Sequence, residues 1–581
     1  MVLALASAIF LACIVSPPSL MDDVDAAQPQ VARNMLDSGD WVTPHLDGIA
    51  YLEKPPLKYW LIAVSMSIFG VHDWAARLPL ALSAIALCWL VFQIGCWAFS
   101  ARAGLYSGLV LSTCVGLFLF TRVLIADVLL TLTVTLALWS FARALDDNEP
   151  RPRLWAALMA AGIGLALLTK GLIGALFPIA AALIYLAFSR QLLHLETWRK
   201  LRVFSGVLIV LAIAAPWHVL ATLRNPPYFY FGLNSGPGEY HGFFWFYFFN
   251  EHVLRFLNRR YPHDYDTVPR LYFWLYHLLW LFPWSAYFPA VASLSFRPVD
   301  RAGKLRMLAL CWTGFVLVFF SFSSTQEYYS MPCYPALALL LGSAMTSQQA
   351  KTLRLGTRMV SILSATAVLT LGYILSRVWS APTPGDISDA LRQNPDDYTL
   401  SLGHMGDLTL NSFAYLRTPV ILALNAFLIG ASARWWRQPF AALALMMLLF
   451  FHAARLAMVT FDPYLSSRPL AEALIKAPTG ELIEDDAYYT FSSVFFYANR
   501  SALLLNGRKT NLEYGSNAPG ALNVFIDDDE FLRRWDQPDR YYLLIEKPSL
   551  SRLEARLDSS RFFVVASRGG KLLLTNHEVA H

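Results

Sequence analysis

Charged residues are scarce in this chain, and their scarcity argues against a soluble globular protein. Asp, Glu, Lys and Arg make up 15% of the 581 residues, whereas soluble domains carry roughly 25%. Hydrophobic residues reach 56% and the mean hydropathy is +0.44, which indicates an integral membrane protein with membrane lipids as partners. The net charge is only +5 and the cations are spread among apolar runs, so no nucleic-acid partner is expected.

Cysteine motifs are also absent. No CxxC or Cys/His spacing occurs, which argues against structural zinc and a disulfide framework. All the cysteines fall inside apolar runs: Cys13, Cys88, Cys96, Cys114, Cys311 and Cys333. The N-terminal apolar run lacks a basic start and an A-x-A cleavage site, so we expect a retained first span rather than a cleaved signal peptide.

Long apolar runs fill most of the first 461 residues and predict an all-α polytopic membrane protein. Runs of about 17–25 residues fit spanning helices, and they lack the alternation of membrane barrel strands. They predict about thirteen spans, near residues 2–18, 74–99, 105–122, 127–145, 154–171, 173–189, 203–222, 271–295, 307–323, 328–345, 359–379, 418–434 and 440–461.

The distribution of cations predicts the orientation of these spans. If the N-terminus is cytoplasmic, the inside loops are short and contain many more cations than acids, as the positive-inside rule requires. Their cations include Arg102, Arg143, Arg151, Arg199, Arg301, Lys351 and Arg434. The outer face then carries the polar segments 19–73, 224–270, 380–417 and 462–581.

Residues 462–581 differ in composition from the membrane domain 1–461 and predict a small soluble α/β domain. Runs rich in β-branched and aromatic residues at 487–498, 523–529, 540–547 and 562–576 predict strands, and 527–537 and 548–559 predict helices. Arg568-Gly569-Gly570-Lys571 is typical of a hairpin turn. No catalytic motif is recognisable in this domain.

The first outer segment opens with three acids, Asp22, Asp23 and Asp25. Pro29 suits the first turn of a short helix that Gly39 would end. An acid ahead of such a helix stabilises its dipole. One acid would suffice for that purpose, so we expect a functional role for at least one of the three.

Two lysines in the second half of this segment, Lys54 and Lys58, flank a double proline and precede the interfacial aromatics Tyr59 and Trp60. They either bind a lipid phosphate or simply extend to the headgroups, as lysines near a membrane do. The residues by themselves favour neither alternative.

Charges close to spans usually have a function, because burying them is costly. Asp127 opens one span and Arg122 ends the previous one, so a structural ion pair between them is one alternative. Lys170 lies in the next outer turn, where Gly171 would let a headgroup phosphate approach the backbone.

The second outer segment contains Glu251 and Arg255, which helical spacing places on one face, with His252 beside them. His252 would ligate a metal only together with an acid from the first segment. A single histidine is more often not a ligand.

Several blocks resemble one family. They are ARNMLDSGDWVTPHLDGIAYLEKPPLKYW, LLTKG, APW, NEHVLRF and YYSMPCYPALALLLG, in this order. The chain resembles bacterial lipid-carrier-dependent glycosyltransferases of the protein O-mannosyltransferase superfamily, in particular those that add 4-amino-4-deoxy-L-arabinose to lipid A. The resemblance implies a GT-C fold and inverting transfer of a sugar from undecaprenyl phosphate at the periplasmic face of the inner membrane, without a nucleotide cofactor.

The resemblance also implies roles for particular residues. Asp25, with Asp22 or Asp23 nearby, and Asp127 correspond to active-site acids. Lys54, Arg255 and Tyr329 are expected near the carrier phosphate, which Lys170, Lys58 and Arg122 would also attract. Glu53 and His252 correspond to ligands of a divalent ion, zinc in the aminoarabinose transferases.

This chain departs from the family pattern at the start of the first outer segment. Val24-Asp25 stands where a diacid is usual, and Ala27 and Gln28 replace Arg and Tyr. The resemblance makes lipid A the expected acceptor, and these departures leave transfer to protein or another envelope glycan as alternatives. A flippase of polyprenyl-linked sugars is the non-enzyme alternative, but such a protein should place polar residues at mid-membrane, where this chain is apolar.

Overall fold

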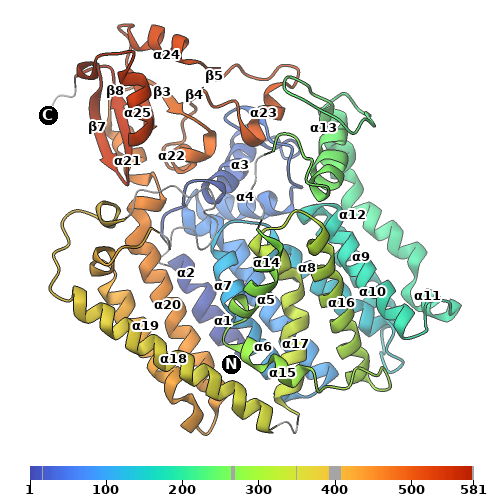
Figure 1. The fold of residues 1–581 in the computed structure, drawn as a ribbon. Helices are drawn as coiled ribbons and strands as arrows, with labels where there is room; N and C mark the ends of the chain where they lie inside the picture. Colours follow the sequence, from blue (N-terminus) through green and yellow to red (C-terminus); the bar gives the residue numbers. More distant parts are fainter. Residues whose placement is uncertain (16–17, 264–267, 348–349, 392–406, 579–581) are drawn as a thin grey trace.

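The structure is a computed structural model that describes residues 1–15, 18–263, 268–347, 350–391 and 407–578. A bundle of helices forms most of the molecule, and a smaller domain with a β-sheet lies at one end (Figure 1). The polar segments before α5, before α14 and after α20 gather at that same end (Figure 1). The predicted fold class is therefore confirmed, although part of the third outer segment, 392–406, lies outside the described residues.

Eight helices of the described chain are long and apolar enough to cross a membrane. They are α5 (Asp73–Ala98), α8 (Asp127–Ala144), α9 (Pro152–Lys170), α11 (Leu195–Leu201) continued by α12 (Val203–Arg224), α16 (Arg301–Phe322), α18 (Ala350–Val378), α19 (Arg417–Ser432) continued by η7 (Ala433–Trp435), and α20 (Pro439–Leu465). A ninth is formed by α6 (Ala101–Ser112) and α7 (Val115–Arg122), if this pair, bent by 46°, counts as one span. The chain is thus a multi-span membrane protein.

The remaining predicted spans correspond to shorter or interrupted helices. They are α1 (Val2–Phe10) with α2 (Ala12–Val15), α10 (Leu172–Phe188), α14 (Arg270–Trp280) with η2 (Trp284–Tyr287) and α15 (Phe288–Val291), and η3 (Glu327–Cys333) with α17 (Tyr334–Met345). Pro283 directly precedes η2 and Pro332 lies inside η3. Proline lacks the backbone N–H that an α-helix requires, which accounts for breaks that hydropathy does not reveal.

The first outer segment folds into α3 (Val24–Ser38), the hairpin β1 (His45–Leu46) and β2 (Ile49–Ala50), and α4 (Leu57–Phe69). Gly39 ends α3 with φ +72°, as predicted. The predicted start was wrong, because α3 begins at Val24 and Pro29 lies inside it. Tertiary contacts of Asp22 and Asp25, described below, hold residues 24–28 in the helix.

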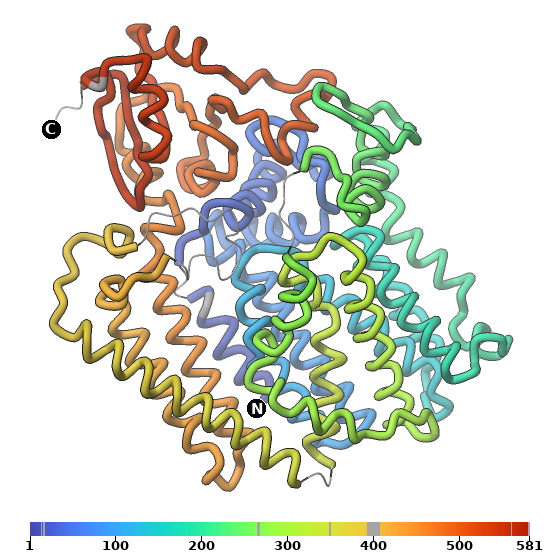
Figure 2. The backbone as a smooth tube through the Cα atoms, viewed as in Figure 1, coloured from blue at the N-terminus to red at the C-terminus, as the bar shows by residue number. Residues whose placement is uncertain are grey.

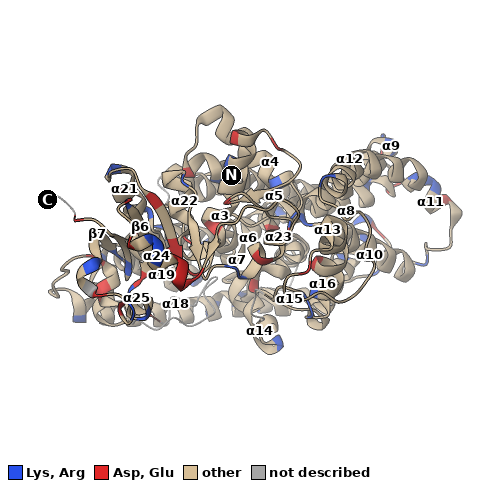
Figure 3. Ribbon diagram, turned by 90° about the horizontal axis from the view of Figure 1, so that it is seen from above, with Lys and Arg blue, Asp and Glu red and all other residues tan. Residues whose placement is uncertain are grey.

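The second outer segment contains α13 (Gly242–Phe244) and the π-helix η1 (Trp245–Leu254). Between α18 and α19 lie η4 (Ile387–Ala390) and η6 (Asn411–Ala414). The backbone trace runs from an N-terminus in the lower half of the view to the C-terminal domain at the top (Figure 2). Charged residues are sparse along most of the helices, whose ribbons are mainly tan (Figure 3).

The C-terminal domain contains a six-stranded sheet in the order β5-β4-β3-β6-β8-β7. Its elements are α21 (Arg468–Lys476), β3 (Glu481–Asp485), η8 (Tyr488–Phe491), α22 (Ser492–Ala498), β4 (Leu503–Leu505), α23 (Thr510–Ser516), β5 (Phe525–Ile526), α24 (Asp528–Trp535), β6 (Tyr541–Glu546), α25 (Lys547–Glu554), η9 (Ser559–Arg561), β7 (Phe563–Arg568) and β8 (Lys571–Thr575). Strands β3 to β6 pair in parallel, whereas β8 is antiparallel to β6 and β7.

Sequence patterns predicted parts of this domain correctly. The hairpin of β7 and β8 turns through Gly569 (φ +58°) and Gly570 (φ +78°), as predicted. Residues 487–498 were expected to form a strand, but they form η8 and α22. The apolar side chains of α22 are buried against α3 and α21, so packing decides its conformation over the strand propensity of its aromatics.

Gly104 provides a test of the helix packing, because it lets α6 lie directly against α5. A Cβ at this position would lie 2.5 Å from Cys96 Sγ and 2.6 Å from Phe92 O. We expect Gly104→Ala to lower the free energy of unfolding by about 1–3 kcal/mol through overpacking. Gly314→Ala on α16 is the matched control, since no atom lies within 4 Å of the added Cβ. The readout is the thermal midpoint in detergent, and equal midpoints for the two variants would contradict the prediction.

Candidate active site

A cavity of about 880 Å³ lies where the outer segments meet the ends of the spans. Its wall combines the first outer segment, the start of α8, the turn between α9 and α10, η1, η3 and the C-terminal domain. Its polar lining includes Asp23, Gln28, Tyr51, Glu53, Lys54, Lys58, Asp127, Lys170, Glu251, His252, Arg255, Tyr329 and Asn511. The fold therefore brings most of the sequence-predicted residues to one place.

The hairpin of β1 and β2 directs the chain toward this cavity. Its turn is built by Asp47 (φ +48°) and Gly48 (φ +77°), which pair Leu46 with Ile49. The segment after β2 then runs without regular structure through Glu53 and Lys54 to the first turn of α4.

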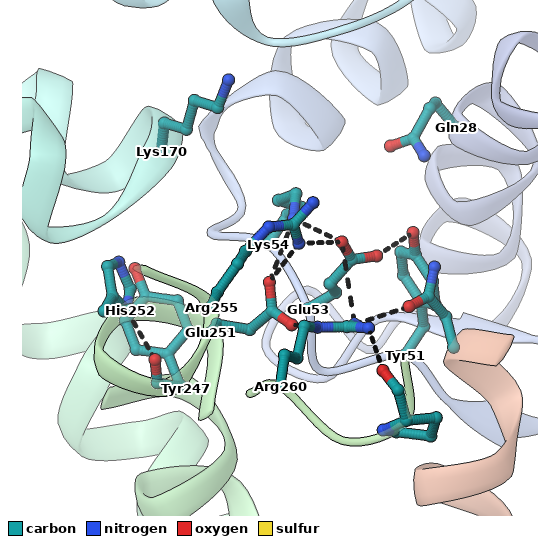
Figure 4. Close-up of polar contacts among 12 residues, drawn as sticks. Gln28, Tyr51, Glu53, Lys54, Lys170, Tyr247, Glu251, His252, Arg255 and Arg260 are labelled. Atoms are coloured by element: carbon teal, nitrogen blue, oxygen red, sulfur yellow. Dashed lines mark hydrogen bonds and ion pairs between the residues drawn. The ribbon is translucent and has the colours of Figure 1, made fainter. Parts of the chain in front are cut away.

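Two buried carboxylates and three cations form the centre of the site (Figure 4). Lys54 Nζ lies 3.3 Å from Glu251 Oε2 and also pairs with Glu53. Arg255 Nη1 lies 3.3 Å from Glu53 Oε1 and 2.9 Å from Glu251 Oε2. Arg260 pairs with Glu251 and lies 4.0 Å from Glu53 Oε1. The cluster therefore has more positive than negative charges.

These cations keep both carboxyl groups ionised. Burial alone would raise the pKa of Glu53, but the charges of Lys54, Arg260 and Arg255 hold it well below its usual range. The same three cations lower the pKa of Glu251 against the effect of burial. The site therefore presents net positive charge to the cavity, which favours binding of an anion such as a phosphate.

Lys170 and Asp127 contribute a further ion pair to the cavity wall. Lys170 Nζ lies 2.6 Å from Asp127 Oδ1 and 4.7 Å from the centre of the Tyr329 ring. The Tyr329 hydroxyl accepts a hydrogen bond of 3.3 Å from Arg255 Nη2. Asp127 thus pairs with Lys170, and the alternative of a structural ion pair between Asp127 and Arg122 was wrong.

Arg122 does not line this cavity. Its guanidinium lies over the ring of Phe118, 5.4 Å from the ring centre, and beside a separate small pocket that also contains Arg77.

His252 uses both ring nitrogens within the protein. Its Nδ1–H donates to Tyr247 O at 2.6 Å, and its Nε2 accepts from the Leu172 N–H at 2.9 Å. Burial lowers the pKa of His252 to about 4, so the ring is neutral. Gly171 permits this approach, because a Cβ there would lie 2.2 Å from His252 Nε2. The space beside Gly171 therefore accommodates the histidine ring rather than a headgroup.

This arrangement does not fit a divalent ion held by Glu53 and His252. The Nε2 lone pair of His252 already accepts a hydrogen bond, and three cations surround Glu53. In the described part of the chain, no group of three His, Cys, Asp or Glu side chains is placed to hold a metal.

The three acids of the first outer segment have different surroundings. Asp25 is buried and accepts hydrogen bonds from Arg77 at 2.9 Å, Leu124 N at 3.0 Å and Met21 N at 3.1 Å. It does not appear in the cavity wall and instead joins α3 to α5 and to the segment that leads to Asp127. Its contacts are those of a scaffold residue.

Asp22 anchors the C-terminal domain. It accepts hydrogen bonds from Ser467 Oγ and Ser493 Oγ, both at 2.6 Å, and pairs with Lys571 at 2.7 Å. Asp23, directly before α3, is exposed and lines the cavity. Of the three acids, Asp23 is the one whose side chain is open to a substrate there.

The C-terminal domain contributes to the site through Tyr489 and Asn511. Asn511 Nδ2 donates to the Tyr489 hydroxyl at 3.0 Å, Tyr489 donates to Tyr51 at 3.2 Å, and Tyr51 donates to Glu53 Oε2 at 2.7 Å. Arg260 Nη2 donates to Asn511 Oδ1 at 2.6 Å. Sequence reasoning missed Arg260, Tyr489 and Asn511, because none of them belongs to a recognisable motif.

The chain is similar to known glycosyltransferases. Residues 53–219 match the family model for dolichyl-phosphate-mannose-protein mannosyltransferase. An undecaprenyl phosphate-alpha-4-amino-4-deoxy-L-arabinose arabinosyl transferase of Pseudomonas fluorescens (strain Pf0-1) is 29% identical over 69% of this chain and 66% of that protein. A protein of the same name from Erwinia tasmaniensis is 25% identical over 87% of this chain and 85% of that protein.

A second relative from Pseudomonas fluorescens (strain Pf-5) is 30% identical, but the match spans only 56% of its length. Among solved structures, ArnT from Cupriavidus metallidurans bound to undecaprenyl phosphate superposes with a TM-score of 0.80 at 22% identity, over 99% of this chain and 97% of that one. The GT-C fold is thus shared over the whole length. The chain resembles polyprenyl-phosphate-sugar glycosyltransferases.

The buried charge cluster predicts a pH-dependent loss of stability on removal of Arg260. Without this cation, burial raises the pKa of Glu251 and penalises its charged form. We expect Arg260→Gln to lower the free energy of unfolding by about 1–3 kcal/mol at neutral pH. This deficit should shrink as the pH falls and Glu251 takes up a proton. Thermal midpoints at pH 5 and pH 7 measure the change, with exposed Arg259→Gln as the control; a deficit that grows toward pH 5 would contradict the prediction.

The contacts of His252 predict that the purified protein does not hold zinc through Glu53 and His252. Elemental analysis after dialysis against zinc should find well below one equivalent per chain. One equivalent that disappears in both Glu53→Gln and His252→Asn would show that the site rearranges to bind the ion.

Proposed function

We propose that this chain is an inverting glycosyltransferase that moves a sugar from undecaprenyl phosphate to an acceptor at the periplasmic face of the bacterial inner membrane. The observation that carries this proposal is a single cavity in which Lys54, Arg255 and Lys170 face the same space as the carboxylates of Asp23 and Asp127. The names of the relatives support 4-amino-4-deoxy-L-arabinose as the sugar, and we propose lipid A as the acceptor.

The cations would bind the carrier phosphate and stabilise the charge that develops on it. During transfer, the bond between the anomeric carbon and the phosphate oxygen breaks, and undecaprenyl phosphate leaves as an anion. Fixed positive groups at this position lower the barrier because they need no reorganisation during the reaction. Lys54 and Arg255 come from the first and second outer segments. The folded chain brings them to the same cavity, so they are already in position when the carrier phosphate binds.

The acceptor oxygen would attack the anomeric carbon from the opposite face, which inverts its configuration. If the acceptor is a hydroxyl, a carboxylate takes up its proton as the new bond forms. Asp23 is suited to this role because it is exposed in the cavity wall, whereas Asp127 is buried. If the acceptor is a phosphate of lipid A, it is already anionic and the acids orient it.

The distribution of charge supports the proposed location. The short loops near Lys200 and Arg301 carry more cations than acids, as expected for the cytoplasmic side. The cavity is formed by segments at the other end of the helices.

Substitutions in the cavity test the site. Lys54→Ala removes a cation from the phosphate cluster, and Asp127→Asn removes the charge that orients Lys170. We expect each to lower the rate of transfer by about 10²–10³-fold, the usual effect of losing one group that stabilises the transition state, without loss of membrane-inserted protein. The rate is measured with purified protein, undecaprenyl-linked sugar and lipid A, and exposed Lys351→Ala is the control. Wild-type rates in both variants would refute the site.

The acceptor is tested by mass spectrometry of lipid A and of glycoproteins from a deletion strain and its complemented parent. We expect loss of a pentosamine from lipid A. Unchanged lipid A together with the loss of a protein-linked sugar would identify protein as the acceptor instead.

A further inference from the structure

Gln28 and Lys58 form a polar pair in the cavity wall that the charge cluster does not include. Gln28 lies in the second turn of α3 and Lys58 in the first turn of α4. The residues are each 3% exposed, yet both line the cavity. Lys58 Nζ donates to Gln28 Oε1 and, at 3.1 Å, to Leu124 O.

Hydrogen-bond donors of this pair remain unused. An ammonium group has three N–H donors and a glutamine amide has two. Lys58 uses two donors within the protein, and Gln28 uses only its oxygen. In the described part of the chain, the amide nitrogen of Gln28 donates to no protein atom and Lys58 takes part in no ion pair. A buried cation without a carboxylate partner is costly, so these donors are placed to meet a ligand.

The charges around Lys58 come from both walls of the cavity. Burial and the charges of Lys54 and Lys170 lower the pKa of Lys58 to about 7, while Glu53 and Asp127 act in the opposite direction. A ligand that supplies oxygen acceptors would stabilise the charged form of Lys58. A ligand group that carries positive charge would be repelled.

We propose that Gln28 and Lys58 form the subsite that binds the hydroxyl oxygens of the transferred sugar. This inference rests on the proposed function and assigns the specificity of the same site. The pair offers donors only, so it recognises a hydroxyl-bearing edge of the sugar. An amino group on the sugar would face away from it, toward the carboxylates of Asp23 or Asp127.

The position of the pair favours the sugar over the carrier phosphate. The phosphate has the cluster of Lys54 and Arg255, which bridges the first and second outer segments. Gln28 lies apart from this cluster, on the opposite side of the close-up from Lys170 (Figure 4). Lys58 also bonds the carbonyl of Leu124, three residues before Asp127, so the subsite is joined to the segment that carries this acid.

The test compares two ligands that differ only by the sugar. Binding of undecaprenyl phosphate and of undecaprenyl-phosphate-linked 4-amino-4-deoxy-L-arabinose is measured on the full-length protein in detergent. Gln28→Met keeps the size of the side chain and removes its donors. We expect it to weaken binding of the sugar-bearing ligand about tenfold, as for the loss of one or two hydrogen bonds, while binding of undecaprenyl phosphate changes less than twofold.

A second variant and a control complete the design. Gln28→Glu should act in the same direction, because its carboxylate pairs with Lys58 and cannot donate. Gln30→Met is the matched control on the same helix, since Gln30 is buried and bonded to Asn34 but does not line the cavity. Lys54→Ala should weaken binding of both ligands.

The outcomes separate the subsite from the proposed function. Equal weakening of both ligands by Gln28→Met would assign the pair to the phosphate and overturn the inference, as would no weakening of either. A raised KM for lipid A with unchanged donor binding would assign the pair to the acceptor and also overturn it. Failure of the wild-type protein to bind undecaprenyl phosphate would refute the proposed function itself.

Discussion

The site depends on one constraint: buried charges must be compensated. Glu53 and Glu251 are buried carboxylates from two distant outer segments, and neither could remain ionised without the cations beside it. Arg255 bridges both acids, and Arg260 extends the cluster to Asn511 of the C-terminal domain. Because removing one member leaves another charge unpaired, the cluster locks three parts of the chain together and leaves net positive charge at the cavity.

The same constraint gives the three acids at the start of the first outer segment different roles. Asp22 binds the C-terminal domain through Ser467, Ser493 and Lys571. Asp25 is engaged by Arg77 and two backbone N–H groups. Asp23 alone of these three lines the cavity. The unusual density of acids therefore serves both the scaffold and the site, and the scaffold accounts for two of the three.

The C-terminal domain completes the cavity rather than merely following the membrane domain. Its contribution includes Tyr489 and Asn511, which reach Glu53 through hydrogen bonds that pass by way of the Tyr51 hydroxyl. Ordinary tyrosine and asparagine side chains carry no signal of such a role in a sequence. Their function arises from the docking of α22 on α3 and of α23 on β2.

Much of the architecture was predictable because it depends on local properties. Long apolar runs predict helices, Gly39 ends α3 and Gly569-Gly570 turns a hairpin, since each depends on the hydropathy or the φ angle of neighbouring residues. The predictions that failed depend on contacts across the chain. Residues 487–498 pack as a helix, Pro29 lies inside α3, and several predicted spans are interrupted.

The candidate site shows the same division. A multi-span membrane protein with its polar residues on the outer segments follows from the amino-acid sequence, because burial of charge in a bilayer is costly whatever the fold. The partners of individual polar side chains follow from the folded arrangement: Lys170 pairs with Asp127, Arg260 pairs with Glu251, and Lys58 donates a hydrogen bond to Gln28. Such pairings depend on distances of a few ångströms between residues far apart in the chain, which composition and spacing do not encode.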